Sequence, residues 1–313
     1  MRSLVPALLV AMLLPSLAGC GASRSLPGGS PVLKPAATNT VQGRTAPVAP
    51  APVGVTTTKG TTGAFFTSTG AAAPTFAPRG DHLAYVTPSK GVLLAAPDGS
   101  NPQLLAGSRP GDRDPAWSPL GDAVVVVRAG AKGGSALVKI SLVGGLTVTL
   151  YEAPGALHQP ACIPGGAGVV FVEEQTTSVL MRLDAPGAKA VALWKGALAA
   201  SPAVAPNAQS VTFERGGADA GLARVAMVGG LVETLKTAGL HARRPSFSGT
   251  GNSLAYVADD GVYVGQPDGT QSKRIAAGNG YESLCWQPGL PRLVVAATQG
   301  SRTDLQRVDL PAR

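Results

Sequence analysis

Short apolar runs alternate with turn residues over most of the chain after residue 70, and one pattern recurs six times. Each copy has a short segment with an apolar residue at its centre and proline at one or both ends. A turn and an apolar run of three or more residues follow. The copy at residues 115–119, which precedes the valines at 124–127, is the most regular. Such runs predict β-strands, and no stretch shows the period of an amphipathic helix.

The spacing of the copies predicts the architecture. They begin at residues 74, 115, 160, 202, 245 and 284, so they lie 39 to 45 residues apart. Units of this length, each with four strand-like segments, are typical of propeller blades. Tight-turn dipeptides such as Asp98-Gly99 and Gly229-Gly230 precede the fourth segment, because glycine adopts the positive φ that hairpin turns require.

The last unit has no fourth segment before the chain stops. A spare strand-like stretch at residues 56–69 precedes the first unit, and it is predicted to supply the missing strand and so to remove two exposed sheet edges. The sequence therefore predicts an all-β chain. Its fold is a six-bladed β-propeller of four-stranded antiparallel blades, closed by an N-terminal strand that completes the last blade.

The first twenty residues have the pattern of an export signal. Arg2 precedes an apolar run at residues 4–14 that is too short to span a bilayer, and Leu-Ala-Gly-Cys follows at residues 17–20. This resembles the lipobox of bacterial lipoproteins. The resemblance implies a lipoprotein signal peptide at residues 1–19 and lipidation of Cys20. The alternative is an ordinary secretory signal with an incidental cysteine.

The anchor implies a location outside the cytoplasm. Gly21, rather than Asp, follows the cysteine. In a diderm source this implies the outer membrane, facing the periplasm, and otherwise the outer face of the cytoplasmic membrane. Residues 20–55 contain the acylated Cys and a Pro, Ala, Ser and Thr-rich stretch that predicts a disordered tether. Residues 56–313 are then the propeller domain.

The repeat at residues 115–122, Pro-Ala-Trp-Ser-Pro-Leu-Gly-Asp, also resembles a known family. With the strand after it and the Gly-Gly or Asp-Gly turns, it is similar to the TolB-type propeller repeat, over roughly residues 56–313. The third and fourth copies depart from that repeat, with Cys162 and Val204 at its aromatic position. The resemblance implies a six-bladed propeller. TolB's role in the Tol–Pal system is not carried over, because a tether stands where TolB has a further N-terminal domain.

Charge adds information about partners. The chain has 26 Lys and Arg against 18 Asp and Glu, a net charge of +8. The basic residues are scattered, whereas a nucleic-acid-binding surface needs a clustered stripe, so we expect no nucleic-acid partner. The milder inference is a surface close to anionic envelope polymers or lipid headgroups. Apart from Cys20, the cysteines are Cys162 and Cys285, in the third and sixth copies, and we expect both to be free thiols.

In a propeller, the loops between blades and those between the second and third strands of each blade meet at one face, around the channel mouth. Charged or polar residues are predicted in these loops in several blades, among them Glu173-Glu174 and Glu214-Arg215. They suggest a rim that binds an envelope protein or polymer, although loops are also polar simply because they face water. The candidate rim comprises Asp112, Arg113, His158, Arg243, Arg244, Tyr281 and Glu282.

Signatures of catalysis are missing from the sequence. There is no Gly-x-Ser-x-Gly elbow, no His-Glu-x-x-His helix and no phosphate-binding loop. We therefore expect no catalytic residues, no metal and no cofactor. The interpretation is a lipid-anchored cell-envelope propeller that acts as a binding or scaffold module through its loop face.

Two alternatives remain open. One is an envelope hydrolase or lyase that acts on glycan or peptide at the channel mouth, with carboxylates such as Glu173, Glu174, Asp112 and Glu282 as acid and base. The other is a structural lipoprotein without a small ligand. Two carboxylates that converge in one rim pocket would favour the enzyme, whereas charges that fan outward would favour the scaffold.

Overall fold

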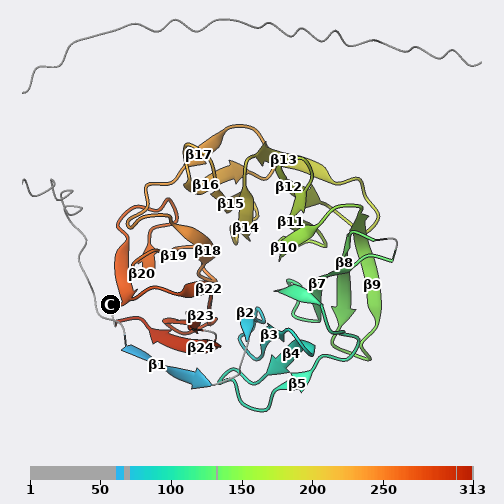
Figure 1. Ribbon diagram of the computed structural model, residues 1–313, viewed down its shortest axis with the longest axis horizontal. Coiled ribbons are helices and arrows are strands. Elements are labelled where there is room, and N and C mark those ends of the chain that lie inside the picture. The colour runs from blue at the N-terminus through green and yellow to red at the C-terminus, as the bar shows by residue number, and fades with distance from the viewer. Residues whose placement is uncertain (1–60, 67–70, 132, 301, 312–313) are drawn as a thin grey trace, which may run out of the picture. The chain divides into compact units, whose positions relative to one another are not determined.

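The computed structural model describes residues 61–66, 71–131, 133–300 and 302–311. The secondary structure of this part of the chain consists of 24 β-strands, which form six four-stranded antiparallel sheets. The sheets are arranged as blades around a central axis, each with its first strand innermost (Figure 1). The predicted six-bladed propeller is therefore confirmed. No helix among the described residues is long and apolar enough to cross a membrane.

In blades 1 to 5 the strands follow the chain outward from the axis. Blade 1 contains β2 (Ala72–Phe76), β3 (Leu83–Thr87), β4 (Gly91–Ala95) and β5 (Gln103–Leu104). Blade 2 contains β6 (Arg113–Trp117), β7 (Ala123–Ala129), β8 (Ser135–Ser141) and β9 (Thr147–Ala153). Blade 3 contains β10 (Leu157–Cys162), β11 (Val169–Glu174), β12 (Ser178–Leu183) and β13 (Val191–Gly196).

The second half repeats this order. Blade 4 contains β14 (Ala199–Val204), β15 (Ser210–Arg215), β16 (Gly221–Ala226) and β17 (Val232–Thr234). Blade 5 contains β18 (Arg243–Phe247), β19 (Leu254–Ala258), β20 (Gly261–Gly265) and β21 (Lys273–Ala277). Blade 6 contains β22 (Tyr281–Trp286), β23 (Arg292–Gln299) and β24 (Arg302–Asp309).

The ring is closed by the two ends of the described chain. The fourth strand of blade 6 is β1 (Thr61–Phe66), which pairs antiparallel with β24. Thr61 lies opposite Asp309, and Phe66 lies opposite Leu305. This confirms the predicted closing strand. The signal peptide at 1–19, Cys20 and the tether to residue 55 lie outside the described residues.

The core lies between adjacent blades, because each sheet packs both of its faces against neighbouring sheets. All five residues of β3 and all five residues of β19 are buried. Trp117 is 6% exposed and its indole Nε1 donates to the carbonyl of Thr75 in blade 1 at 3.0 Å. Trp286 makes the same contact with the carbonyl of Ser246 in blade 5. The aromatic position of the repeat therefore packs between blades in these two copies.

Both remaining cysteines are free. Cys285 is buried between blades 6 and 1, and Cys162 packs against the core between blades 2 and 3. Both are free thiols, as expected, although only Cys285 is fully buried and Cys162 is half-buried.

Two details differ from the sequence-based expectation. The charged pairs Glu173–Glu174 and Glu214–Arg215 were expected in loops, but they are the last residues of β11 and β15. These strands continue past their apolar runs because their neighbours still offer backbone partners: Glu173 pairs with both Leu157 and Val179. Two of the outermost strands are shorter than expected: β5 has only two residues and β17 only three, where five and six were expected.

Candidate functional site

The innermost strand of blades 1 to 5 carries a bulge near the channel mouth. In each of these strands two residues oppose a single residue of the neighbouring strand. In blade 2, Arg113 pairs with Val127 and Ala116 pairs with Val125, so the two residues between Arg113 and Ala116 oppose the single residue between Val127 and Val125. The residue before the repeat's first proline adopts a left-handed conformation with φ between 50 and 53°. These residues are Ala73, Asp114, Gln159, Ser201 and Arg244.

Left-handed φ values are uncommon for residues other than glycine and cost about 1–3 kcal/mol each. Ala73 has no polar side chain, so the bulge itself belongs to the repeat. The polar side chains at the other four positions belong to blades 2 to 5 alone. The strained backbone thus places four polar residues at equivalent points near the axis.

These residues form a chain of hydrogen bonds from blade to blade. The backbone N–H of Gln159 in blade 3 donates to Asp114 Oδ2 in blade 2 at 3.2 Å. The backbone N–H of Ser201 in blade 4 donates to Gln159 Oε1 at 2.7 Å. The side chains of Asp114 and Gln159 therefore each satisfy the backbone N–H of the equivalent residue in the next blade. The bulge removes these N–H groups from the strand ladder.

Glu214 extends this chain to blade 5. The Ser201 side chain is short, and it is the Glu214 carboxylate on β15 that lies beside the backbone N–H of Arg244. Burial raises the pKa of Glu214, although the positive charges of Arg244 and Arg243 act in the opposite direction. By strand pairing, the equivalent positions in the other blades hold Val86, Val127, Val172, Val257 and Ala297.

The sequence reasoning expected Glu214 in a polar loop but did not include it in the candidate rim. The sequence nonetheless distinguishes Glu214, because it is the one carboxylate at a repeat position where the other blades have apolar residues. The repeats must be aligned strand by strand before that exception can be seen.

Two predicted rim residues lie together across the interface between blades 2 and 3. Arg113 Nη1 lies 3.0 Å from Asp114 Oδ2 and 3.2 Å from His158 Nδ1. Burial, and then the charge of Arg113, lower the pKa of His158. The imidazole is therefore neutral at pH 7, with Nδ1 accepting from Arg113 and the proton on Nε2.

The two adjacent arginines of blade 5 have different surroundings. Arg243 Nη1 pairs with Asp259 Oδ1 at 3.0 Å, and His241 Nδ1 contacts Asp259 Oδ2 at 2.6 Å. The hydrogen bond with His241 is the main reason why the pKa of Asp259 is lowered. Arg244 Nη1 donates instead to Ser201 Oγ at 3.1 Å, a neutral partner in blade 4. None of the ion pairs found among the described residues involves Arg244.

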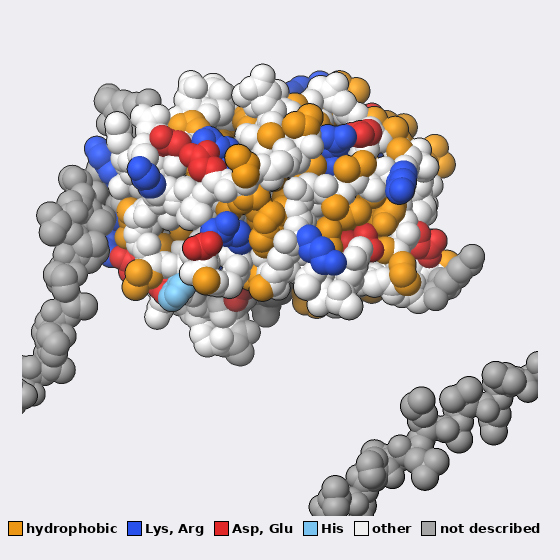
Figure 2. All heavy atoms as spheres, turned by 90° about the horizontal axis from the view of Figure 1, so that it is seen from above, with side chains coloured by type: hydrophobic (Ala, Val, Ile, Leu, Met, Phe, Trp, Pro, Cys, Tyr) orange, Lys and Arg blue, Asp and Glu red, His pale blue; other side chains and the backbone are white. Residues whose placement is uncertain are grey.

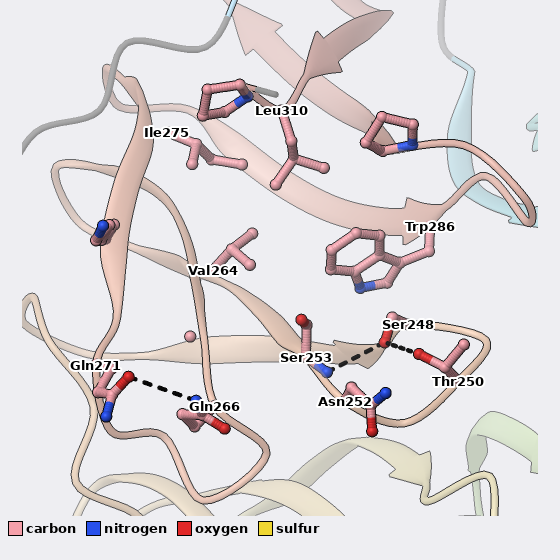
Figure 3. Close-up of a pocket in the computed structure, with 14 residues that line it drawn as sticks. Ser248, Thr250, Asn252, Ser253, Val264, Gln266, Gln271, Ile275, Trp286 and Leu310 are labelled. Atoms are coloured by element: carbon pink, nitrogen blue, oxygen red, sulfur yellow. Dashed lines mark hydrogen bonds between the residues drawn. The ribbon is translucent and has the colours of Figure 1, made fainter. Parts of the chain in front are cut away.

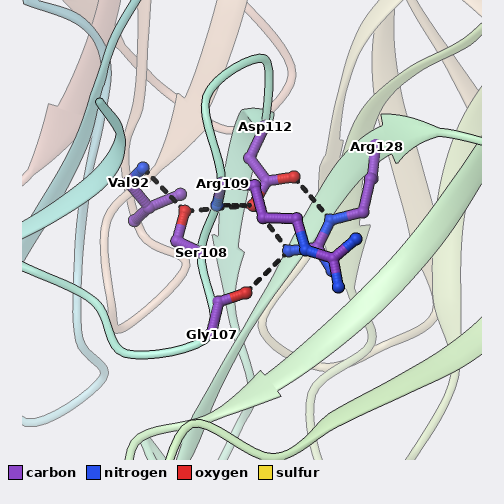
Figure 4. A network of polar contacts seen from close by, with 6 residues as sticks. All are labelled: Val92, Gly107, Ser108, Arg109, Asp112 and Arg128. Atoms are coloured by element: carbon purple, nitrogen blue, oxygen red, sulfur yellow. Dashed lines mark hydrogen bonds and ion pairs between the residues drawn. The ribbon is translucent and has the colours of Figure 1, made fainter. Parts of the chain in front are cut away.

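Asp112 has a structural environment (Figure 4). Its side chain is fully buried. Arg128 Nε lies 2.7 Å from its Oδ1, and Arg128 Nη2 lies 2.7 Å from its Oδ2. Ser108 Oγ and the backbone N–H of Arg109 donate to Asp112 Oδ2 as well, and Ser108 Oγ accepts from the N–H of Val92. The carboxylate therefore holds the connection between blades 1 and 2 in place.

The rim residues of blade 6 stand apart from this network. Tyr281 is 8% exposed, and burial raises the pKa of its hydroxyl, which donates to the carbonyl of Ala277 at 3.4 Å. Glu282 is exposed and accepts a hydrogen bond from Thr298 Oγ1 at 2.6 Å. The structure thus connects the predicted rim residues Arg113, His158 and Arg244 through blades 2 to 5, with Arg243 adjacent.

The four carboxylates of the enzyme alternative have separate partners. Asp112 binds Arg128, and Glu282 accepts from Thr298. Glu173 accepts from Tyr151 Oη at 3.0 Å, and Glu174 accepts from Ser178 Oγ at 2.7 Å. In the part of the chain described, no group of three or more His, Cys, Asp or Glu side chains has the geometry to hold a metal ion.

Comparison with known proteins supports the fold. No family model and no curated protein matches the sequence. Among solved structures, TolB from Acinetobacter baumannii matches with a TM-score of 0.61 and 19% identity, over 76% of this chain and 63% of that one. The match shows that the two chains share a fold. The chain spans less than two thirds of that TolB.

Other propellers of the same shape have different functions. A putative TolB from Agrobacterium tumefaciens matches with a TM-score of 0.61 and 15% identity, over 79% of this chain and 93% of that one. A gluconolactonase from Xanthomonas campestris matches with a TM-score of 0.63 and 14% identity, over 80% of this chain and 90% of that one. At such identities the likeness shows the fold alone.

Proposed function

We propose that this protein is a lipid-anchored module of the cell envelope that binds an acidic segment of an envelope protein at its channel mouth. The observation that carries the proposal is the hydrogen-bonded chain of strained residues that ends at Arg244. Backbone strain of this kind persists where the surrounding structure enforces it, and it is frequent at binding sites. Here it fixes side chains from four blades at one mouth.

The charges at the mouth favour an anionic partner. Asp259 is engaged by His241 and Arg243, and Asp114 is engaged by Arg113. The Arg244 side chain donates to a neutral hydroxyl, and the Glu214 carboxylate lies close enough to sense its charge. In the proposal, the Arg244 guanidinium also binds a carboxylate of the partner in bidentate fashion. On the side of the propeller shown in Figure 2, basic and acidic side chains are instead interspersed.

The enzyme alternative has weaker support. General acid–base work needs carboxylates that face one reacting group, and the four candidates bond to separate neighbours. A TolB-type fold also occurs in gluconolactonase, so the fold does not decide between the two functions.

Capture of partners from envelope extract tests the binding surface. The full chain carrying Arg113→Glu, Arg243→Glu and Arg244→Glu together is expected to recover its partner at least about tenfold less well than the unchanged chain, because like charges repel. Recovery is measured by quantitative mass spectrometry.

The control is Arg79→Glu, which makes the same kind of charge reversal at one position, in an exposed turn at the opposite end of the blades. It is expected to leave recovery unchanged. Equal recovery by the triple variant and the unchanged chain would exclude the channel mouth as the binding surface.

The anchor is tested separately through Cys20. Cys20→Ser removes the thiol that would carry the lipid, and each buried methylene of an acyl chain contributes about 0.8 kcal/mol to membrane binding. The variant is therefore expected to move from the membrane pellet to the soluble fraction on ultracentrifugation. Cys285→Ser serves as the control and should stay in the pellet. A Cys20→Ser variant that also stays there would rule out the lipid anchor.

A further inference from the structure

A cleft lies at the opposite end of the propeller, between blades 5 and 6 (Figure 3). It is lined by the turns β18–β19, β20–β21 and β22–β23 and by Leu310 and Pro311, which follow β24. The channel mouth is formed by the loops at the other ends of these strands. The cleft encloses about 860 Å³, within the range of about 300–1,000 Å³ of small-molecule sites.

The cleft has an apolar side and a polar side (Figure 3). Trp286, Val264, Ile275 and Leu310 form the apolar side. Hydroxyl and amide groups face them, and Gln266 Nε2 donates to Gln271 Oε1 at 3.4 Å. Lys273 is the one charged residue among those that line the cleft. The polar side comprises Ser248, Thr250, Asn252, Ser253, Gln266 and Gln271.

The equivalent place between blades 1 and 2 shows why this cleft is open. There Trp117 occupies the position of Trp286 and makes the same indole hydrogen bond to the preceding blade. His82 covers it, with ring centroids 6.3 Å apart, and Trp117 is only 6% exposed. Ser253 takes the place of His82 in blade 5, since both precede the Leu-Ala-Tyr-Val strand.

A second replacement widens the gap. Leu94 packs against the core between blades 1 and 2, and strand pairing places the smaller Val264 at the same point in blade 5. Two smaller side chains thus leave Trp286 only partly buried. The opening is a property of this interface and not of the repeat.

We propose that this cleft binds a neutral oligosaccharide. A sugar ring presents an apolar face that packs on an indole, and its hydroxyls both donate and accept hydrogen bonds. Amide and hydroxyl side chains offer the same mixture of donors and acceptors without requiring a charge on the ligand. The site is independent of the channel mouth, because it shares no residue with it.

Calorimetric titration of the full chain, held in a zwitterionic detergent without sugar headgroups, tests the site. The probes are cellotetraose, maltotetraose and tetra-N-acetylchitotetraose. At least one is expected to bind saturably in a one-to-one complex. Ser253→His should weaken that binding at least about tenfold by covering Trp286, and Gln266→Ala about threefold by removing one amide.

Ser210→His is the matched control. Ser210 is the equivalent residue in blade 4: it is the first residue of β15 and directly precedes Val211, as Ser253 precedes Leu254. It should leave binding within about twofold of the unchanged chain.

Three results would overturn the proposal. One is that none of the probes binds up to about 10 mM, far above the range of a specific site. Another is equal binding by the Ser253→His and Ser210→His variants. The third is that only an acidic oligosaccharide such as tetragalacturonate binds, and that Arg244→Glu abolishes this binding, which would place it at the channel mouth.

Discussion

Replacement of Asp112 by Ala is expected to destabilise the propeller by about 3–5 kcal/mol. The side chain of Asp112 is fully buried and that of Arg128 is 12% exposed, so the substitution leaves a nearly buried guanidinium without its counter-charge. It also removes the acceptor for Ser108 Oγ and for the backbone N–H of Arg109. Urea unfolding followed by circular dichroism measures the loss as a lower midpoint at an unchanged slope.

The control for Asp112→Ala is an ion pair of the same length at the surface. Arg224 Nη2 lies 2.7 Å from Glu233 Oε2, but the Glu233 side chain is 60% exposed. Because water solvates both groups there, Glu233→Ala is expected to cost less than about 1 kcal/mol. If the two substitutions cost the same, burial of Asp112 does not contribute as argued.

A paired substitution separates charge from packing. Asp112→Ala combined with Arg128→Met removes both charges and keeps most of the apolar stem of residue 128. The double variant is expected to be more stable than Asp112→Ala alone, since no uncompensated charge remains. A double variant as unstable as the single one would show that the hydrogen bonds to Ser108 and Arg109, and not the ion pair, carry the effect.

The repeat made most of the fold predictable. Its prolines and central apolar residues mark the inner strands, and the Gly-containing dipeptides mark the turns before the outer strands. Blade packing then follows, because strands such as β3 and β19 are apolar on both faces. The lengths of the outermost strands were less predictable, since β5 and β17 face solvent and few contacts fix where they end.

The site was less predictable for a conformational reason. The residues with left-handed φ have nothing in common as side chains, so no propensity marks them, and only the proline that follows is shared. Asp112 and Arg113 are neighbours in sequence, and both were candidates for the rim. Burial separates them, because Asp112 turns to Arg128 while Arg113 faces Asp114 and His158.

The cleft between blades 5 and 6 shows a different limit. From the sequence, the candidate binding surface was predicted at the channel mouth because the charged loop residues lie there. The exchange of His82 for Ser253 becomes informative only when the structure shows that this turn position covers a tryptophan.

Removal of residues 1–66 is expected to convert the protein into a self-associating form with a lower melting temperature. β24 would lose the partner with which it pairs at five positions, and its unpaired N–H and C=O groups would form an exposed edge that templates association. Each lost hydrogen bond contributes about 0.5–1.5 kcal/mol net, so the sum is several kcal/mol. Size-exclusion chromatography and thermal unfolding measure the two effects.

A chain that lacks only residues 1–55 provides the comparison, because it retains β1. It is expected to elute as a monomer and to unfold at the temperature of the full chain. If the shorter truncation behaves like the longer one, residues before β1 contribute to closure as well. If both remain monomeric and equally stable, the pairing of β1 with β24 does not close the ring, and the three remaining strands of blade 6 are sufficient to hold it against blades 5 and 1.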